Sequence, residues 1–178
     1  MQHITWKKVS ERHERVGYRD VYHKTFVMPD GNKADWTTVG KGAVVGILPI
    51  TNDGKIVCAT QFRAGPERIC TELPGGAVDE GETAEVAAAR ELLEETGYEG
   101  TLKLIACTPH DAYADIVRYH FLATGCRQVP SVANDEHEFI EPQLLSVDEF
   151  ITKLYAGGMT DDATALFGLR ELEKLGVH

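Results

Sequence analysis

Three glutamates lie close together in this sequence at spacings that place them on one side of a helix. Glu91, Glu94 and Glu95 stand at i, i+3 and i+4 in a segment rich in strong helix formers. Their charges repel one another and oppose the negative end of the helix dipole, so the arrangement is unfavourable by itself. A hard cation such as Mg²⁺ takes oxygen ligands and is usually shared between carboxylates and substrate phosphates. The spacing therefore indicates either a metal site or a solvated acidic face paired with Arg90.

A glycine-containing bend and a short polar loop precede this helix. The bend has the sequence Pro-Gly-Gly and ends at Gly76, and glycine there lets the backbone approach an ion or ligand closely. Gly76, five residues, Glu82, seven residues and then the run over residues 90–97 resemble the signature of the Nudix hydrolases. Every fixed polar and glycine position of that signature is filled. Tyr98 is the one departure, because the family prefers an aliphatic residue there.

The resemblance implies a role for each matching residue. The implied metal ligands are the Gly76 carbonyl and the carboxylates of Glu91, Glu94 and Glu95. Glu95 also counts among the catalytic residues. Glu82 and Arg90 would support the site through charge-assisted hydrogen bonds. The implied cofactor is Mg²⁺, with Mn²⁺ as an alternative, and the implied partner is a small nucleoside diphosphate derivative.

The composition agrees with a metal-mediated site for a polyanion. The chain has 178 residues, with 18 Lys and Arg against 28 Asp and Glu, which gives a formal net charge of −10. Binding to nucleic acid or to an anionic membrane depends on basic side chains that neutralise phosphates, so this balance argues against both kinds of partner. An acidic protein can still bind a phosphorylated small molecule through a divalent cation.

The sequence divides into two regions of different residue composition. Residues 1–40 mix β-branched, aromatic and polar residues, which predicts an antiparallel β meander. A meander with so little apolar mass must pack on the rest of the chain or on a second copy. The resemblance implies the second copy, because in the ADP-ribose pyrophosphatase branch of the family such an extension commonly pairs with a second subunit, so we expect a dimerisation element of a homodimer. Residues 41–178 would form the Nudix hydrolase domain.

The expected fold is α+β, a Nudix-type α/β/α sandwich with a mixed sheet and an N-terminal antiparallel β extension. Apolar runs bounded by turn residues predict the strands. Predicted strands cover residues 3–9, 18–28, 36–39, 43–50, 55–62, 102–108, 116–123 and 139–145. One helix is predicted over 84–96, a second after the capping-box sequence at 146–149, and a third between Thr160 and Gly176.

Features outside the signature are similar to the ADP-ribose and nucleotide-sugar pyrophosphatase branch of the family. The resemblance implies Mg²⁺-dependent hydrolysis of the pyrophosphate bond of ADP-ribose or a related nucleoside diphosphate-sugar, to a nucleoside monophosphate and a sugar phosphate. Arg63 and Arg68 are candidates for the substrate phosphates, with surface ion pairs as the alternative. Tyr113 is a candidate for stacking on a base or sugar, or for plain packing.

The branch also implies a catalytic glutamate on a loop beyond the signature. Glu136 and Glu138 lie in the acidic loop of that region, and either could act as the general base on a water molecule. The alternative is a solvated surface loop. Two other functions stay open: a housecleaning hydrolase of modified nucleoside triphosphates, and a non-catalytic Nudix module that senses a sugar nucleotide.

The cysteines and the N-terminal residues indicate a compartment. Cys58, Cys70, Cys107 and Cys126 are scattered through apolar stretches without a CxxC pair, so we expect buried, reduced thiols. No apolar signal segment is visible at the N-terminus. We therefore expect a cytoplasmic protein.

Overall fold

The computed structural model describes residues 4–130 and 139–177, which fall into two units. The N-terminal unit comprises residues 1–42 and 109–117, and the main unit comprises residues 43–108 and 118–178. Strand β3 (Lys33–Thr51) runs from one unit into the other along the chain.

An antiparallel meander forms the N-terminal unit. Strand β1 (Lys7–Val16) pairs with β2 (Arg19–Val27), and β2 pairs with the first half of β3 (Lys33–Thr51). The turn between β1 and β2 passes through Gly17, whose φ of 62° favours glycine. The predicted strand over 3–9 was wrong in extent, because β1 is polar along most of its length and gives little hydrophobic alternation to locate it.

Strand β3 is one long strand where the sequence predicted two. It passes through Gly40 and Gly42, whose φ values are 66° and 119°. These glycines interrupt the apolar pattern, which is why the two halves look separate in the sequence. A Cβ atom on Gly40 would lie 2.5 Å from Cδ1 of Ile116, so a glycine also lets this part of the meander pack closely.

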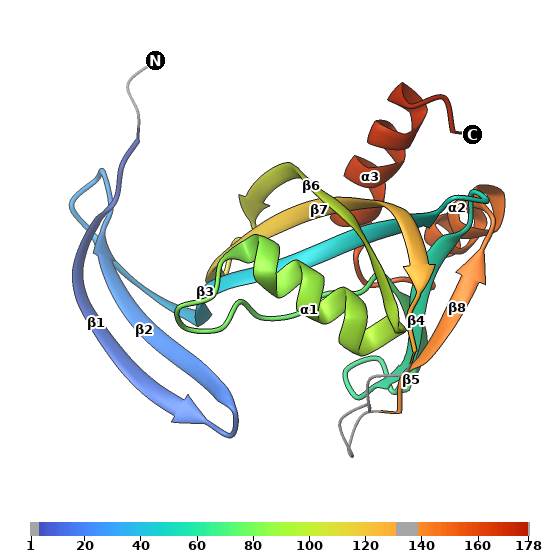
Figure 1. Cartoon of the computed structure of the whole chain (residues 1–178). Coiled ribbons are helices and arrows are strands. Elements are labelled where there is room, and N and C mark those ends of the chain that lie inside the picture. Colours follow the sequence, from blue (N-terminus) through green and yellow to red (C-terminus); the bar gives the residue numbers. More distant parts are fainter. Residues whose placement is uncertain (1–3, 131–138, 178) are drawn as a thin grey trace. The chain divides into compact units, whose positions relative to one another are not determined.

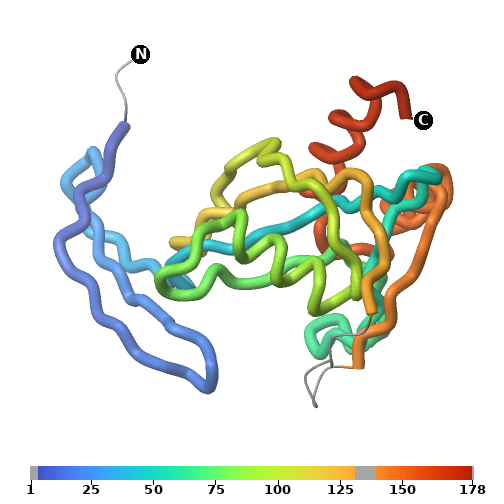
Figure 2. The backbone as a smooth tube through the Cα atoms, in the orientation of Figure 1, coloured from blue at the N-terminus to red at the C-terminus, as the bar shows by residue number. Residues whose placement is uncertain are grey.

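The main unit is built around a sheet in which β4 (Ile56–Arg63) lies between β5 (Arg68–Glu72) and β8 (Glu141–Leu145), both antiparallel to it. Figure 2 shows β8 running beside β4. Strand β6 (Tyr98–Pro109) pairs with β7 (Ala114–Gln128), and β7 also pairs with β3. Strand β5 was not predicted, because five residues with charged ends carry little hydrophobic pattern.

Local signals position the three helices found among the described residues. Helix α1 (Ala84–Thr96) has the predicted bounds: the Thr83 hydroxyl accepts a hydrogen bond from the Val86 N–H, and Gly97 ends the helix with a φ of 71°. Helix α2 (Val147–Tyr155) begins with the predicted capping box. Helix α3 (Asp162–Lys174) follows a short turn.

Helices cover both faces of the main-unit sheet. Alternate residues of a strand face opposite sides, so β3 sends Val45 and Ile47 toward α1 and Leu48 toward α2 and α3. Figure 1 shows α1 in front of these strands and α3 behind them. The predicted α+β fold, a Nudix-type α/β/α sandwich with an N-terminal β extension, is confirmed.

The four cysteines are free thiols, as expected, but one of them is not buried. Cys58, Cys70 and Cys126 are buried, whereas Cys107 on β6 is exposed. The prediction was wrong for Cys107 because most of β6 is exposed or only partly buried, although its sequence is largely apolar around Cys107. Among residues 4–130 and 139–177, no helix is long and apolar enough to cross a membrane.

Candidate active site

The Pro-Gly-Gly bend lies against strand β3. The Gly76 carbonyl accepts a hydrogen bond from the Val45 N–H at 2.8 Å, and the Pro74 carbonyl accepts one from the Ile47 N–H at 2.9 Å. The bend therefore continues the sheet beside β3 and is fixed by the same kind of bonds as a strand.

Two glycines allow close contact on both sides of this bend. A Cβ atom on Gly76 would lie 2.3 Å from Oε1 of Glu91, so the Glu91 carboxylate occupies the space of the missing side chain. A Cβ atom on Gly75 would lie 2.3 Å from the carbonyl oxygen of Val45. Gly75 is therefore needed for the bend to pack against the backbone of β3, whereas Gly76 leaves room for the Glu91 carboxylate where it stands.

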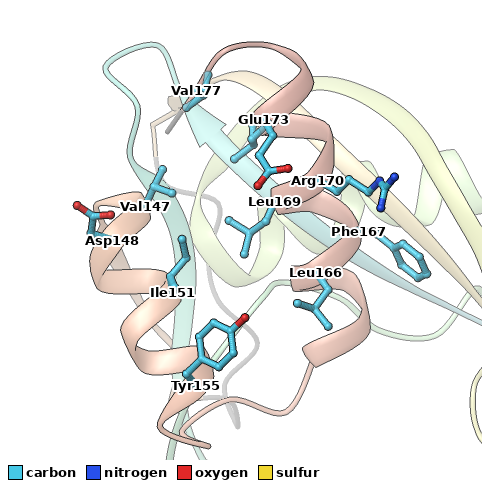
Figure 3. Close-up of a pocket in the computed structure, with 11 residues that line it drawn as sticks. Val147, Asp148, Ile151, Tyr155, Leu166, Phe167, Leu169, Arg170, Glu173 and Val177 are labelled. Carbon is cyan, nitrogen blue, oxygen red and sulfur yellow. The ribbon is translucent and has the colours of Figure 1, made fainter.

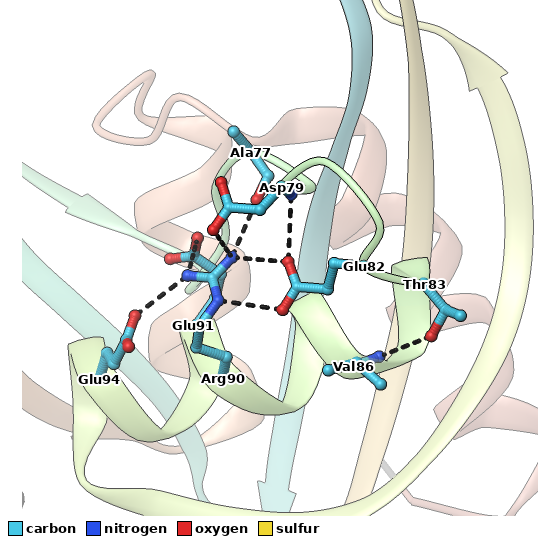
Figure 4. A network of polar contacts seen from close by, with 8 residues as sticks. All are labelled: Ala77, Asp79, Glu82, Thr83, Val86, Arg90, Glu91 and Glu94. Atoms are coloured by element: carbon cyan, nitrogen blue, oxygen red, sulfur yellow. Dashed lines mark hydrogen bonds and ion pairs between the residues drawn. The ribbon is translucent and has the colours of Figure 1, made fainter.

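Arg90 is the centre of an ionic network on α1 (Figure 4). Its Nε and Nη2 atoms donate to the two carboxylate oxygens of Glu82, each at 3.1 Å, and Nη2 also donates to the Ala77 carbonyl. Its Nη1 atom donates to Glu91 at 2.8 Å and to Glu94 at 3.1 Å. One guanidinium therefore links the loop before α1 to two of its acidic side chains.

These contacts change the acidity of the groups involved. Hydrogen bonds from Arg90, and then the bond from the Asp79 N–H, lower the pKa of Glu82 below its ordinary value. The same bond from Arg90 to Glu82, with those to Glu91 and Glu94, raises the pKa of Arg90. The loop carboxylate and the arginine therefore stay charged over the whole physiological pH range.

The three signature glutamates differ in their surroundings. Glu95 accepts a hydrogen bond from the Gly75 N–H at 2.9 Å, and Glu91 lies over Gly76. Both carboxylates thus face the bend. The side chain of Glu94 is 52% exposed and is held by Arg90 on the outer side of the helix.

The oxygen atoms at this place suit a hard divalent cation. As the side chains stand, no three acidic, histidine or cysteine side chains in the described part of the chain converge as a metal-binding group. The donors that the bend and α1 present are carboxylates and a carbonyl, the ligands that Mg²⁺ and Mn²⁺ prefer. The Gly76 carbonyl uses one lone pair for Val45 and has a second. These residues therefore fit the implied ion.

The two candidate arginines lie opposite each other in the β4–β5 ladder. The Nε and Nη2 atoms of Arg63 donate to the buried Glu72 at 2.7 and 2.5 Å, and this bond is the main cause that raises the pKa of Arg63. Arg68 donates from Nη2 to the Gly157 carbonyl at 2.9 Å. The structure thus places both arginines at one end of this hairpin.

Tyr113 belongs to the N-terminal unit. Its ring stacks on Trp36, with ring centroids 6.2 Å apart, and Trp36 in turn contacts Trp6. Together with Lys24, Phe26 and other residues they line a pocket of about 450 Å³. No sequence pattern indicates this aromatic cluster, because Trp6, Phe26, Trp36 and Tyr113 come from four separate segments and share no periodicity.

A groove between α2 and α3 lies on the face of the sheet away from α1 (Figure 3). Its volume is about 590 Å³, and most of its lining is apolar, including Ile151, Leu166 and Leu169. The charged residues in the lining are Asp148, Arg170 and Glu173. This mostly apolar lining does not offer the row of carboxylates that α1 presents beside the bend.

The proposed general base lies outside the described residues. Glu136 and Glu138 both fall in the interval 131–138, so their roles stay predictions.

Comparison with known proteins identifies the family. The family model described as "NUDIX domain" matches residues 40–164, which include the whole signature. The chain belongs to the Nudix hydrolases. The predicted enzyme class and the resemblance to the ADP-ribose and nucleotide-sugar pyrophosphatase branch are confirmed by this match and by the relatives.

Relatives and a solved structure match the Nudix chain over most of its length. It is 31% identical over 157 residues to the ADP-ribose pyrophosphatase of Bacillus subtilis (strain 168), covering 86% of this chain and 84% of that protein. It is 32% identical to the methanol dehydrogenase activator of Bacillus methanolicus, covering 78% and 77%. A crystal structure of an ADP compounds hydrolase matches all of both chains with a TM-score of 0.81 at 19% identity, which shows a shared fold.

Proposed function

We propose that this protein hydrolyses the pyrophosphate bond of ADP-ribose or a related nucleoside diphosphate-sugar in the presence of Mg²⁺ or Mn²⁺. The products are a nucleoside monophosphate and a sugar phosphate. The observation that carries the proposal is the placement of Glu91 and Glu95 against the Gly75-Gly76 bend, within a Nudix signature whose polar and glycine positions are all filled. The relative from Bacillus subtilis, named as an ADP-ribose pyrophosphatase, supports the choice of substrate class.

The signature residues would have two roles, binding the cation and supporting the residues that bind it. Glu91, Glu94, Glu95 and the Gly76 carbonyl would hold the cation. When bound, the cation neutralises diphosphate charge and makes water a stronger nucleophile. Glu82 fixes Arg90, and Arg90 in turn bonds to Glu91 and Glu94 on the acidic face of α1.

The groups that would contact substrate lie outside the signature. Arg63 and Arg68 are the candidates for the phosphates, because both lie at one end of the β4–β5 hairpin. Tyr113, whose ring lines an aromatic pocket, is the candidate for stacking on the base. Glu136 or Glu138 would take the proton of the attacking water.

The proposal includes a homodimer formed through residues 1–40, and a cytoplasmic location. Strand β1 ends the strand order of the sheet, and nearly all of its residues are exposed. An edge strand of ten residues offers unpaired backbone groups to a second copy. This supports the homodimer, while the location rests on the sequence alone.

A substrate panel tests the activity. The purified protein is incubated with MgCl₂ and ADP-ribose, ADP-glucose, UDP-glucose, GDP-mannose or 8-oxo-dGTP, and products are separated by ion-exchange chromatography. We expect a nucleoside monophosphate and a sugar phosphate from at least one sugar nucleotide, and none when EDTA replaces MgCl₂. Release of pyrophosphate from 8-oxo-dGTP alone would instead indicate a housecleaning hydrolase. Binding of a sugar nucleotide without turnover would indicate a sensing module.

A further inference from the structure

Glu72 is a buried carboxylate that accepts hydrogen bonds from three residues, two on β4 and one in the turn before α3. Glu72 is the last residue of β5 and is only 1% exposed. It accepts from Gln61 Nε2 at 3.1 Å and from Nε and Nη2 of Arg63. Its other oxygen accepts from the Thr160 hydroxyl at 2.5 Å. Burying a charge is costly, and an apolar residue is often as stable at such a place, so stability alone is a weak reason for this glutamate.

The bonds to Glu72 fix the orientation of Arg63. They use one edge of the guanidinium, formed by Nε and Nη2, so Nη1 points away from the buried carboxylate. The Arg63 side chain is 45% exposed. After the contribution of Glu72, the negative charges of Glu95 and Asp161 also raise the pKa of Arg63. Glu72 itself stands three residues before Gly75 of the bend, so this ion pair lies next to the bend along the chain.

The turn between α2 and α3 holds this arrangement from the other side. Thr160 donates to Glu72, and the Gly157 carbonyl accepts from Arg68. Asp161 stands at the N-cap position of α3 but makes no capping bond with its side chain. Its carboxylate instead pairs with Arg118 on β7. The turn therefore ties the β4–β5 hairpin to β7 and leaves the usual capping interaction unmade.

We propose that Glu72 is a positioning residue for Arg63, and that Thr160 holds Glu72 in the required rotamer. Fixed in this way, the outer edge of the Arg63 guanidinium faces the diphosphate of the substrate beside the signature helix. The inference rests on the proposed function, because that function supplies the diphosphate. A merely structural ion pair would stabilise the fold without affecting substrate affinity.

A double-mutant cycle tests whether Glu72 acts through Arg63. The variants are Glu72→Gln, Arg63→Gln and the double variant, each measured for kcat, KM and calorimetric affinity for α,β-methylene-ADP with MgCl₂. We expect Glu72→Gln to raise KM and weaken α,β-methylene-ADP binding about tenfold in the wild-type background, and less than about twofold in the Arg63→Gln background. A full tenfold effect in both backgrounds overturns the proposal. Unchanged KM and affinity in a folded Glu72→Gln variant also overturn it.

Thr160 provides a second, milder test that keeps the fold intact. Thr160→Val removes the hydroxyl donor at nearly constant volume, and Thr160→Ser restores it. Thr152→Val, on the exposed side of α2, is the matched control. We expect a severalfold rise in KM for Thr160→Val only, and rescue by Thr160→Ser. Equal KM values in all three variants contradict the role of Thr160 in positioning.

The two levels of failure can be told apart. A wild-type protein that neither binds α,β-methylene-ADP nor hydrolyses any sugar nucleotide overturns the proposed function, and the inference with it. A wild-type protein that does both, but gives additive effects in the cycle, overturns only the positioning role of Glu72.

Discussion

Neighbouring carboxylates of helix α1 have different surroundings, so we expect their substitutions to reduce activity by different amounts. Glu95 is bonded to the backbone of the bend, whereas Glu94 is exposed and held by Arg90. Glu95→Gln keeps an acceptor for the Gly75 N–H and removes a proposed ion ligand, so the fold should survive while kcat falls by about a thousandfold. We expect only about a tenfold loss for Glu94→Gln. Steady-state kinetics with melting curves check both, and a Glu95→Gln variant of near-normal activity would remove Glu95 from the mechanism.

A buried histidine predicts how stability changes with pH. His120 is 0% exposed, its two ring nitrogens lie 2.9 Å from the hydroxyls of Thr108 and Thr164, and burial lowers its pKa to about 4, with a further contribution from Arg118. The unfolded chain therefore binds the extra proton at a higher pH, near the ordinary pKa of about 6.5. Stability from this group is complete above pH 6.5 and is lost as pH falls toward 4.

The size of this effect can be measured. Between pH 7 and pH 5 the free energy of unfolding should fall by about 2 kcal/mol because of His120. Urea unfolding at a series of pH values gives the slope, and His120→Gln, which cannot titrate, should flatten it. A slope that is the same in both proteins would show that His120 does not account for it.

At the scale of elements, the function of helix α1 depends on its close packing against the Pro-Gly-Gly bend. Gly76→Ala would place Cβ against the end of the flexible Glu91 side chain, which can move, so the fold should be nearly as stable while activity is lost. Gly75→Ala would place Cβ against the backbone carbonyl of Val45, which cannot move easily. We expect that variant to lose about 2 kcal/mol of stability. Denaturant unfolding and activity assays on Gly75→Ala and Gly76→Ala check these expectations. Equal stability of the two variants would contradict the geometry.

The sequence was informative where structure depends on local signals. The Thr83 cap, the helix formers and Gly97 located α1 to the residue, and the signature identified six candidate residues within 23 positions. The polar strand β1 was misplaced and β5 was missed, because their positions depend on pairing with other strands. The contact of Glu72 with Thr160 joins residues 88 apart, and no local pattern could reveal it.

At the scale of the whole molecule, the N-terminal meander predicts association. Exposed apolar side chains in this unit include Ile4, Val9 and Tyr18, and β1 is an edge strand. We expect multi-angle light scattering on the full chain to give the mass of a dimer, twice 19.6 kDa, at micromolar concentration. A strict monomer over that range would contradict the dimerisation role.

The net charge of −10 makes a divalent cation the natural link between this protein and a diphosphate. Calorimetric titration of MgCl₂ and MnCl₂ into the protein, with and without α,β-methylene-ADP, tests this link most directly, with the Glu91→Gln/Glu95→Gln variant as control. We predict uptake by the wild-type protein that tightens when the nucleotide is present and is lost in the double variant. No uptake under either condition, or equal uptake by the double variant, would contradict the account.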